Sequence, residues 1–106
     1  MFRQFFAVEG SYCAKTCTPG ICAYCHSNFP KLEKEHVIPK SIGGTYTIRV
    51  CKTCNRERAD SFTYEPFVKW TRSHIKEFHR AVQIAIQNNP KNKNIILGEI
   101  AKIPHP

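Results

Sequence analysis

A glutamate and a histidine stand side by side at Glu35 and His36, within LEKEHVIPK, and an asparagine follows at Asn55. Carboxylate and carboxamide oxygens are hard ligands that suit Mg²⁺ or Mn²⁺ rather than zinc. A neutral imidazole can take a proton from water near physiological pH. Glu35 and Asn55 as ligands of a divalent ion, with His36 as general base, would together hydrolyse a phosphodiester bond.

The position of the pair within a strand raises a geometric difficulty. Adjacent residues of an ideal strand point to opposite faces, so Glu35 and His36 would not both face one phosphate. A bend or a strong twist at this point would be needed. Spacing alone therefore leaves the pair open to a second interpretation, two ordinary residues of a strand.

Four cysteines surround the Glu-His pair in two Cys-x2-Cys units, Cys22 with Cys25 and Cys51 with Cys54. A closed tetrahedral shell of four thiolates is a common solution for structural Zn²⁺. The second unit precedes a predicted helix, whose dipole would help to hold thiolate charge. Because Asn55 directly follows the last of these cysteines, the zinc site would also fix its position.

Two further cysteines, Cys13 and Cys17, have a spacing that suits one face of a helical turn better than a zinc knuckle. They could replace Cys22 as a ligand, form a disulfide, or be buried as small apolar residues, and we expect the last.

The chain carries no sign of export or of membrane insertion. The apolar part of MFRQFFAVEG is too short for a secretory signal and Glu9 interrupts it. No run approaches the roughly 18 to 20 apolar residues that span a bilayer. We therefore expect a cytoplasmic protein, in which paired cysteines bind metal more often than they form disulfides.

Net charge favours a polyanionic partner. The 106 residues include 16 Lys and Arg against eight Asp and Glu, a formal net charge of +8. We expect a polyanion as partner and no membrane surface, because the basic residues are spread along the chain rather than clustered beside an apolar anchor. Candidates for contact with its phosphates are Lys40, Arg49, Lys52 and Arg56.

A hairpin and a short helix are predicted to position these residues. Residues 32–38 and the stretch YTIRV read as two antiparallel strands on either side of a Gly-Gly turn. CKTCNRERADS then begins a short helix. Residues 1–12 suggest a short strand or turn, and residues 13–31 are expected to form loops and knuckles.

A long amphipathic helix is predicted from residue 61 or 63 to residue 87, because its apolar residues follow i, i+3, i+7 spacing. His74 lies on the apolar stripe and is interpreted as a core histidine. The tail IILGEIAKIP is apolar enough to dock on the core or on a second subunit.

The stretch CAYCHSNFPKLEKEHVIPKSIGGTYTIRVCKTCNRERADS resembles the HNH family of nucleases, which have a ββα-metal fold with a structural zinc. The resemblance implies that His36 is the general base and that Asn55 is a metal ligand. It places Glu35 where the family usually has a metal-binding Asp. The family's hairpin twists at this position, which would bring both side chains to one phosphate.

Two residues depart from the family pattern. Glu35 is one methylene longer than the usual Asp, and the family's middle asparagine is missing, with Thr47 nearest its place. Arg58, three residues after Asn55, stands where the family often has Lys. The resemblance implies that Arg58 holds a phosphate, and the alternative is a solvated surface residue.

The sequence therefore predicts one α+β domain over residues 1–106. It comprises a Cys-containing segment (1–21), a small ββα-metal HNH core with structural Zn²⁺ (22–61) and a helical extension (62–106). The resemblance implies DNA endonuclease activity with catalytic Mg²⁺ or Mn²⁺, and DNA, double-stranded or branched, as the partner. The alternatives are a junction-cleaving nuclease of the phage recombination type, a non-catalytic zinc-dependent nucleic-acid-binding module, and a protein-interaction domain. A homodimer through the C-terminal helix and tail is a further expectation.

Overall fold

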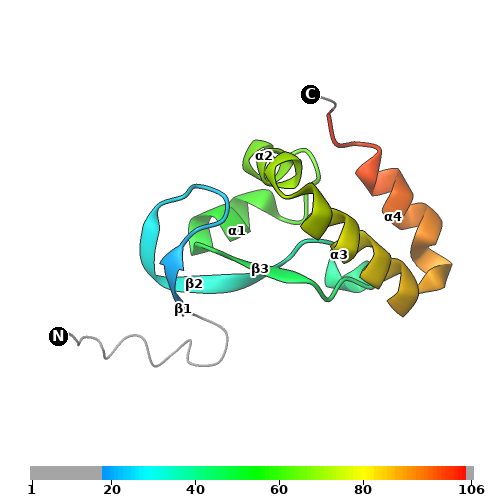
Figure 1. Ribbon diagram of the computed structural model, residues 1–106, viewed down its shortest axis with the longest axis horizontal. Coiled ribbons are helices and arrows are strands. Elements are labelled where there is room, and N and C mark those ends of the chain that lie inside the picture. The colour runs from blue at the N-terminus through cyan, green and yellow to red at the C-terminus, as the bar shows by residue number, and fades with distance from the viewer. Residues whose placement is uncertain (1–17, 105–106) are drawn as a thin grey trace.

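A computed structural model describes residues 18–104 as a three-stranded antiparallel sheet and four α-helices (Figure 1). The predicted α+β class is confirmed. The expected N-terminal strand or turn, Cys13 and Cys17 lie outside the described residues. No helix within residues 18–104 is long and apolar enough to cross a membrane.

The sheet has the order β1-β2-β3, so that β2 (Asn28–His36) is paired on both sides. Strand β1 (Thr18–Ile21) was expected to be a loop, and this expectation was wrong. Its sequence, TPGI, has the composition of a turn, but its register with β2 contains an irregularity between Thr18 and Gly20. A bulge of this kind tolerates glycine within a strand.

The predicted hairpin is present as β2 and β3 (Thr47–Val50). Its register pairs Glu33 with Val50 and His36 with Thr47. A short 3₁₀ helix (Lys40–Ile42) and the Gly-Gly turn join the two strands. Gly43 has φ 106°, a left-handed conformation that glycine adopts without strain.

Helix α1 (Lys52–Arg58) follows β3 and lies over the hairpin (Figure 1). Cys51 is its N-cap, and the sulfur of Cys51 accepts a hydrogen bond from the backbone N–H of Cys54. The helix ends at Ala59, which has a left-handed φ of 45°. The second Cys-x2-Cys unit therefore forms the first turn of this helix, as predicted.

The predicted long helix consists of two helices, α2 (Glu65–Ser73) and α3 (Ile75–Asn88), so the single-helix prediction was wrong. They meet at His74, whose φ of −129° and ψ of 50° are not helical. His74 is exposed rather than in the core, and its ring stacks on Trp70. The break allows Phe67 of α2 and Phe78 of α3 to pack edge to face, with ring centroids 6.2 Å apart.

Helix α4 (Lys93–Ile100) follows a short 3₁₀ helix (Pro90–Asn92) and runs beside α3 (Figure 1). Ile96 of α4 is completely buried and belongs to the main apolar cluster. The tail therefore docks on the core of its own chain, the first of the two expected alternatives. The homodimer remains a prediction.

One apolar core joins the hairpin to the helices. Its members include Val37 after β2, Val50 at the end of β3, and Phe67 of α2, which are all fully buried. The core thus lies directly behind the end of β2, where the Glu-His pair is located.

Candidate functional site

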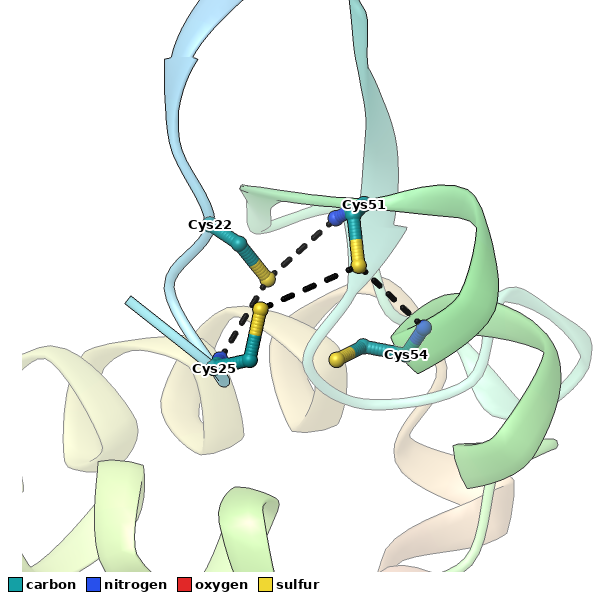
Figure 2. Close-up of side chains that lie close together, drawn as sticks. All are labelled: Cys22, Cys25, Cys51 and Cys54. Atoms are coloured by element: carbon teal, nitrogen blue, oxygen red, sulfur yellow. Dashed lines mark hydrogen bonds between the residues drawn. The ribbon is translucent and has the colours of Figure 1, made fainter. Parts of the chain in front are cut away.

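The four predicted zinc ligands come together at one end of the hairpin. The side chains of Cys22 and Cys25 point toward those of Cys51 and Cys54 (Figure 2). All four sulfur atoms lie within 4.8 Å of one another, and those of Cys25 and Cys51 are 4.0 Å apart. A tetrahedral Zn²⁺ with Zn–S bonds of about 2.3 Å needs sulfur atoms about 3.8 Å apart. The cluster therefore fits a structural metal such as zinc.

Backbone N–H groups around Cys22 favour its thiolate form. Its sulfur accepts hydrogen bonds from the N–H groups of Tyr24, Cys25 and Cys51 at 3.3 to 3.4 Å. Burial raises the pKa of the Cys22 thiol, but these hydrogen bonds outweigh burial and lower the pKa to about 7. The hydrogen bonds from these N–H groups therefore favour the negatively charged sulfur of Cys22, the form that binds a cation.

Deprotonation of the other two buried thiols, those of Cys51 and Cys54, depends more strongly on a bound metal. Burial raises the pKa values of Cys51 and Cys54, and backbone hydrogen bonding only partly opposes this for Cys51. Such thiols lose their protons when a metal binds, because the metal supplies the positive charge that burial removes.

The cysteine cluster also fixes two neighbouring positions outside it. Asn55 follows Cys54 in α1, and Glu33 is paired in the sheet with Val50, the residue before Cys51. The side chains of Asn55 and Glu33 meet, with Nδ2 of Asn55 donating to Oε1 of Glu33 at 2.8 Å. Both are half-buried, and Glu33 forms no ion pair with a residue in the range 18–104.

His36 ends β2, opposite Thr47 in the register. It is half-buried, and its ring forms no hydrogen bond or ion pair with any residue that the structure describes. Neither ring nitrogen is thus engaged by a residue in the range 18–104. A general base would need a nitrogen without an internal partner, since it must accept a proton from water.

Glu35 is placed differently from the metal ligand that the sequence suggested. Its side chain is nearly completely buried, and Oε2 accepts hydrogen bonds from Nη1 of Arg58 at 2.9 Å and from the Tyr24 hydroxyl at 3.0 Å. Burial raises the pKa of Tyr24, so its hydroxyl remains a donor at neutral pH. The charge of Glu35 is therefore compensated inside the protein, and Glu35 as placed does not fit a metal ligand.

Arg58 is also placed differently from the solvent-facing cation that the sequence suggested. It is completely buried, and its guanidinium lies 3.7 Å from the ring centroid of Phe67. It donates to three backbone carbonyls, those of His36, Val37 and Ser61, at 2.9 to 3.0 Å. Because these acceptors and Glu35 occupy it, Arg58 has no free face for a phosphate, and it instead ties α1 to the end of β2.

The sequence interpretation missed Tyr24 and Glu33. Tyr24 lies inside the first knuckle, and no local pattern indicates that it reaches Glu35, 11 residues away. Glu33 could have been found, because strand alternation places it on the same face as Glu35. That face is the one that contacts α1, where Glu33 meets Asn55 and Glu35 meets Arg58.

The basic residues proposed to contact DNA are found on three elements. Lys52 and Arg56 are exposed and lie four residues apart in α1, so they share one side of the helix. Lys40 is exposed in the 3₁₀ helix after β2. Arg49 is half-buried in β3, opposite Lys34. Lys52 and Arg56 are the two that flank Asn55.

Comparison with known proteins agrees with the architecture of this site. Residues 22–68 match a family model described as HNH endonuclease. This segment begins at the first zinc-ligand candidate and ends within α2. No curated protein and no solved structure matches the chain.

Proposed function

We propose that this chain, whose residues 22–68 belong to the HNH endonuclease family, is a metal-dependent endonuclease that hydrolyses phosphodiester bonds of DNA. His36 would act as the general base that takes a proton from the attacking water. Asn55 would contribute an oxygen ligand to a divalent ion, Mg²⁺ or Mn²⁺. Such an ion would stabilise negative charge on the phosphate and on the leaving oxygen.

One observation carries this proposal. The four cysteine sulfurs hold the hairpin against the first turn of α1, so the strand that ends in His36 and the helix that begins before Asn55 are joined by one small cluster. Arg58 adds a second tie through the His36 carbonyl. The candidate base and the candidate ligand therefore belong to a single rigid unit, which is the kind of support that a catalytic site needs.

A plasmid nicking assay with zinc-loaded protein and added Mg²⁺ or Mn²⁺ tests the proposal. His36→Ala should lower the rate by about 10² to 10⁴-fold, because a general base typically contributes this much. Zinc content and folding should be unchanged. His79→Ala is the matched control, since His79 is an exposed histidine of α3 with no proposed role.

Two results would contradict the catalytic proposal. The first is a parent protein that nicks no DNA with either ion. The second is a His36→Ala variant that nicks at the rate of the parent. Comparison of linear duplex with four-way junctions would show whether cleavage selects branched DNA, as a junction-cleaving nuclease would.

A second candidate function is a zinc-dependent module that binds nucleic acid without cutting it. The buried pair between Glu35 and Arg58 favours it, because the carboxylate at the family's usual metal position is already neutralised. The net charge of +8 serves this function equally well. DNA binding without nicking in both divalent ions would select this candidate.

A reducing compartment such as the cytoplasm suits either candidate. Thiols persist there, and none of the four cysteines of the cluster forms a disulfide.

A further inference from the structure

We infer that Glu33, and not Glu35, is the carboxylate that joins Asn55 in holding the divalent ion. This inference rests on the proposed function and assigns its metal ligands.

Glu35 already has a cation as its partner. Its Oε2 accepts from Nη1 of Arg58 at 2.9 Å, and neither side chain is exposed to solvent by more than a few per cent. A divalent ion at Glu35 would be placed beside the guanidinium in a poorly solvated site, where repulsion between like charges is strong. Ligation by Glu35 would therefore require the buried ion pair to open.

Glu33 differs from Glu35 in its surroundings. It is half-buried, and it forms no ion pair within the part of the chain that the structure describes. Among the described residues, the side-chain partner of its carboxylate is the neutral carboxamide of Asn55. No cation of residues 18–104 therefore competes with an added ion for Glu33.

The distance between the side chains of Glu33 and Asn55 suits two ligands of one ion. The amide nitrogen of Asn55, Nδ2, lies 2.8 Å from Oε1 of Glu33. Adjacent oxygen ligands of an octahedral Mg²⁺ with bonds of about 2.1 Å lie about 3 Å apart. A carboxamide presents its nitrogen or its oxygen by rotation about one bond, and the hydrogen-bond network decides between them. Rotation of the Asn55 carboxamide would direct its oxygen, together with Oε1 of Glu33, at one cation. This orientation of Asn55 would be favoured only when a cation is bound.

The cysteine cluster lies beside both positions. Asn55 adjoins Cys54, and Glu33 pairs with Val50, which adjoins Cys51. The two side chains therefore approach from two elements that meet at the same cluster. A preformed approach of this kind lowers the ordering cost of ion binding.

Binding of Mn²⁺ to the zinc-loaded chain of 106 residues tests the assignment without any cleavage measurement. The free Mn²⁺ signal in electron paramagnetic resonance gives the affinity. Glu33→Gln keeps the shape of the side chain and an acceptor for Asn55, but it removes the charge. We expect Glu33→Gln to weaken Mn²⁺ binding at least about tenfold. Mutation of a residue that only hydrogen-bonds a metal ligand typically lowers metal affinity by about that factor, and Glu33 is proposed to be a ligand itself. Glu35→Gln should change the affinity far less.

The outcomes separate the assignment from the proposed function. If the parent binds Mn²⁺ and nicks DNA while Glu33→Gln binds Mn²⁺ as the parent does, the assignment fails and the proposed function stands. If Glu35→Gln is the variant that loses binding, Glu35 is the ligand and the assignment also fails. Should Glu35→Gln not fold, the comparison of Glu33→Gln with the parent still decides. A parent that neither binds Mn²⁺ nor nicks DNA contradicts both.

Discussion

Arg58 shows how far the role of one residue depends on distant partners. A charged side chain is almost never fully buried unless it is paired. Sequence spacing gave Arg58 a place on a short helix but no partner, which favoured a solvent-facing position. Its partners Tyr24 and Glu35 lie 34 and 23 residues away, so only the folded chain brings the three together.

The buried pair leads to a prediction about stability. Arg58→Met keeps an unbranched apolar stem but leaves Glu35 buried without a cation. Removing one partner of a buried ion pair typically destabilises a protein by about 3 to 5 kcal/mol. We therefore expect a loss of this size in the free energy of unfolding, measured by urea denaturation of the zinc-loaded protein.

Arg56→Met is the matched control, because Arg56 is an exposed arginine of the same helix. It should change the free energy of unfolding by less than about 0.5 kcal/mol. The double variant Arg58→Met with Glu35→Gln should be less destabilised than the sum of the two single variants, since the unpaired charge is gone. An Arg58→Met protein with the stability of the parent would show that the pair contributes nothing.

At the scale of elements, the sequence identified those with a strong local signal. The hairpin was predicted from alternating residues around a Gly-Gly turn, and α1 from the second cysteine unit. The break at His74 was missed because no proline or glycine marks it, and it accompanies the packing of Phe67 of α2 against Phe78 of α3. Strand β1 was missed because its Pro and Gly residues are typical of a turn. It is a strand because it pairs with β2, and this pairing is a tertiary contact that a local sequence pattern does not reveal.

The same distinction applies to the candidate site. The four cysteines and Asn55 could be placed from spacing, because a metal cluster imposes its own geometry on short motifs. The side chains that Glu33 and Glu35 contact could not be predicted, because both glutamates lie on the same face of β2. Only the position of α1 decides that Glu33 meets Asn55 and Glu35 meets Arg58.

The cluster should determine whether these elements fold together. Cys51→Ser removes a buried ligand that is also the N-cap of α1. We expect loss of bound zinc and of most native structure, because metal binding and folding are coupled in such small sites. Zinc content by atomic absorption and helicity by circular dichroism provide the measurements.

Thr53→Ser is the matched control for this change, since Thr53 is exposed and lies between the two cysteines of the same unit. It should retain one zinc per chain and the spectrum of the parent. Full zinc occupancy with a native spectrum in Cys51→Ser would mean that the cluster is not the structural metal site.

At the scale of the whole molecule, positive charge is distributed over several surfaces. The break at His74 divides the basic side that one long helix would have presented. On α2, Lys69 lies 3.8 Å from Glu65, and Arg72 donates to the carbonyl of Pro104. Lys52 and Arg56 of α1 instead share an exposed side next to Asn55. Helix α1 is therefore better placed than α2 to contact nucleic acid near Asn55.

This placement predicts a change in the salt dependence of DNA binding. Each phosphate that a cation neutralises contributes about 0.9 to the slope of log affinity against log salt concentration. Lys52→Ala with Arg56→Ala should therefore reduce the slope by about 2, and should weaken binding similarly for all DNA sequences. Fluorescence anisotropy with a labelled duplex, measured over a range of salt concentrations, gives both quantities.

Lys91→Ala with Lys93→Ala removes the same net charge from exposed positions in the 3₁₀ helix and α4. This control separates local contact from the long-range field of the molecule, because exposed charges farther apart than about 10 Å are largely screened at 0.1 M salt. If both double variants lower the slope equally, the DNA responds only to net charge, and α1 has no special role. A smaller effect at Lys91 and Lys93 would place the DNA backbone along α1, beside the residues proposed to act on it.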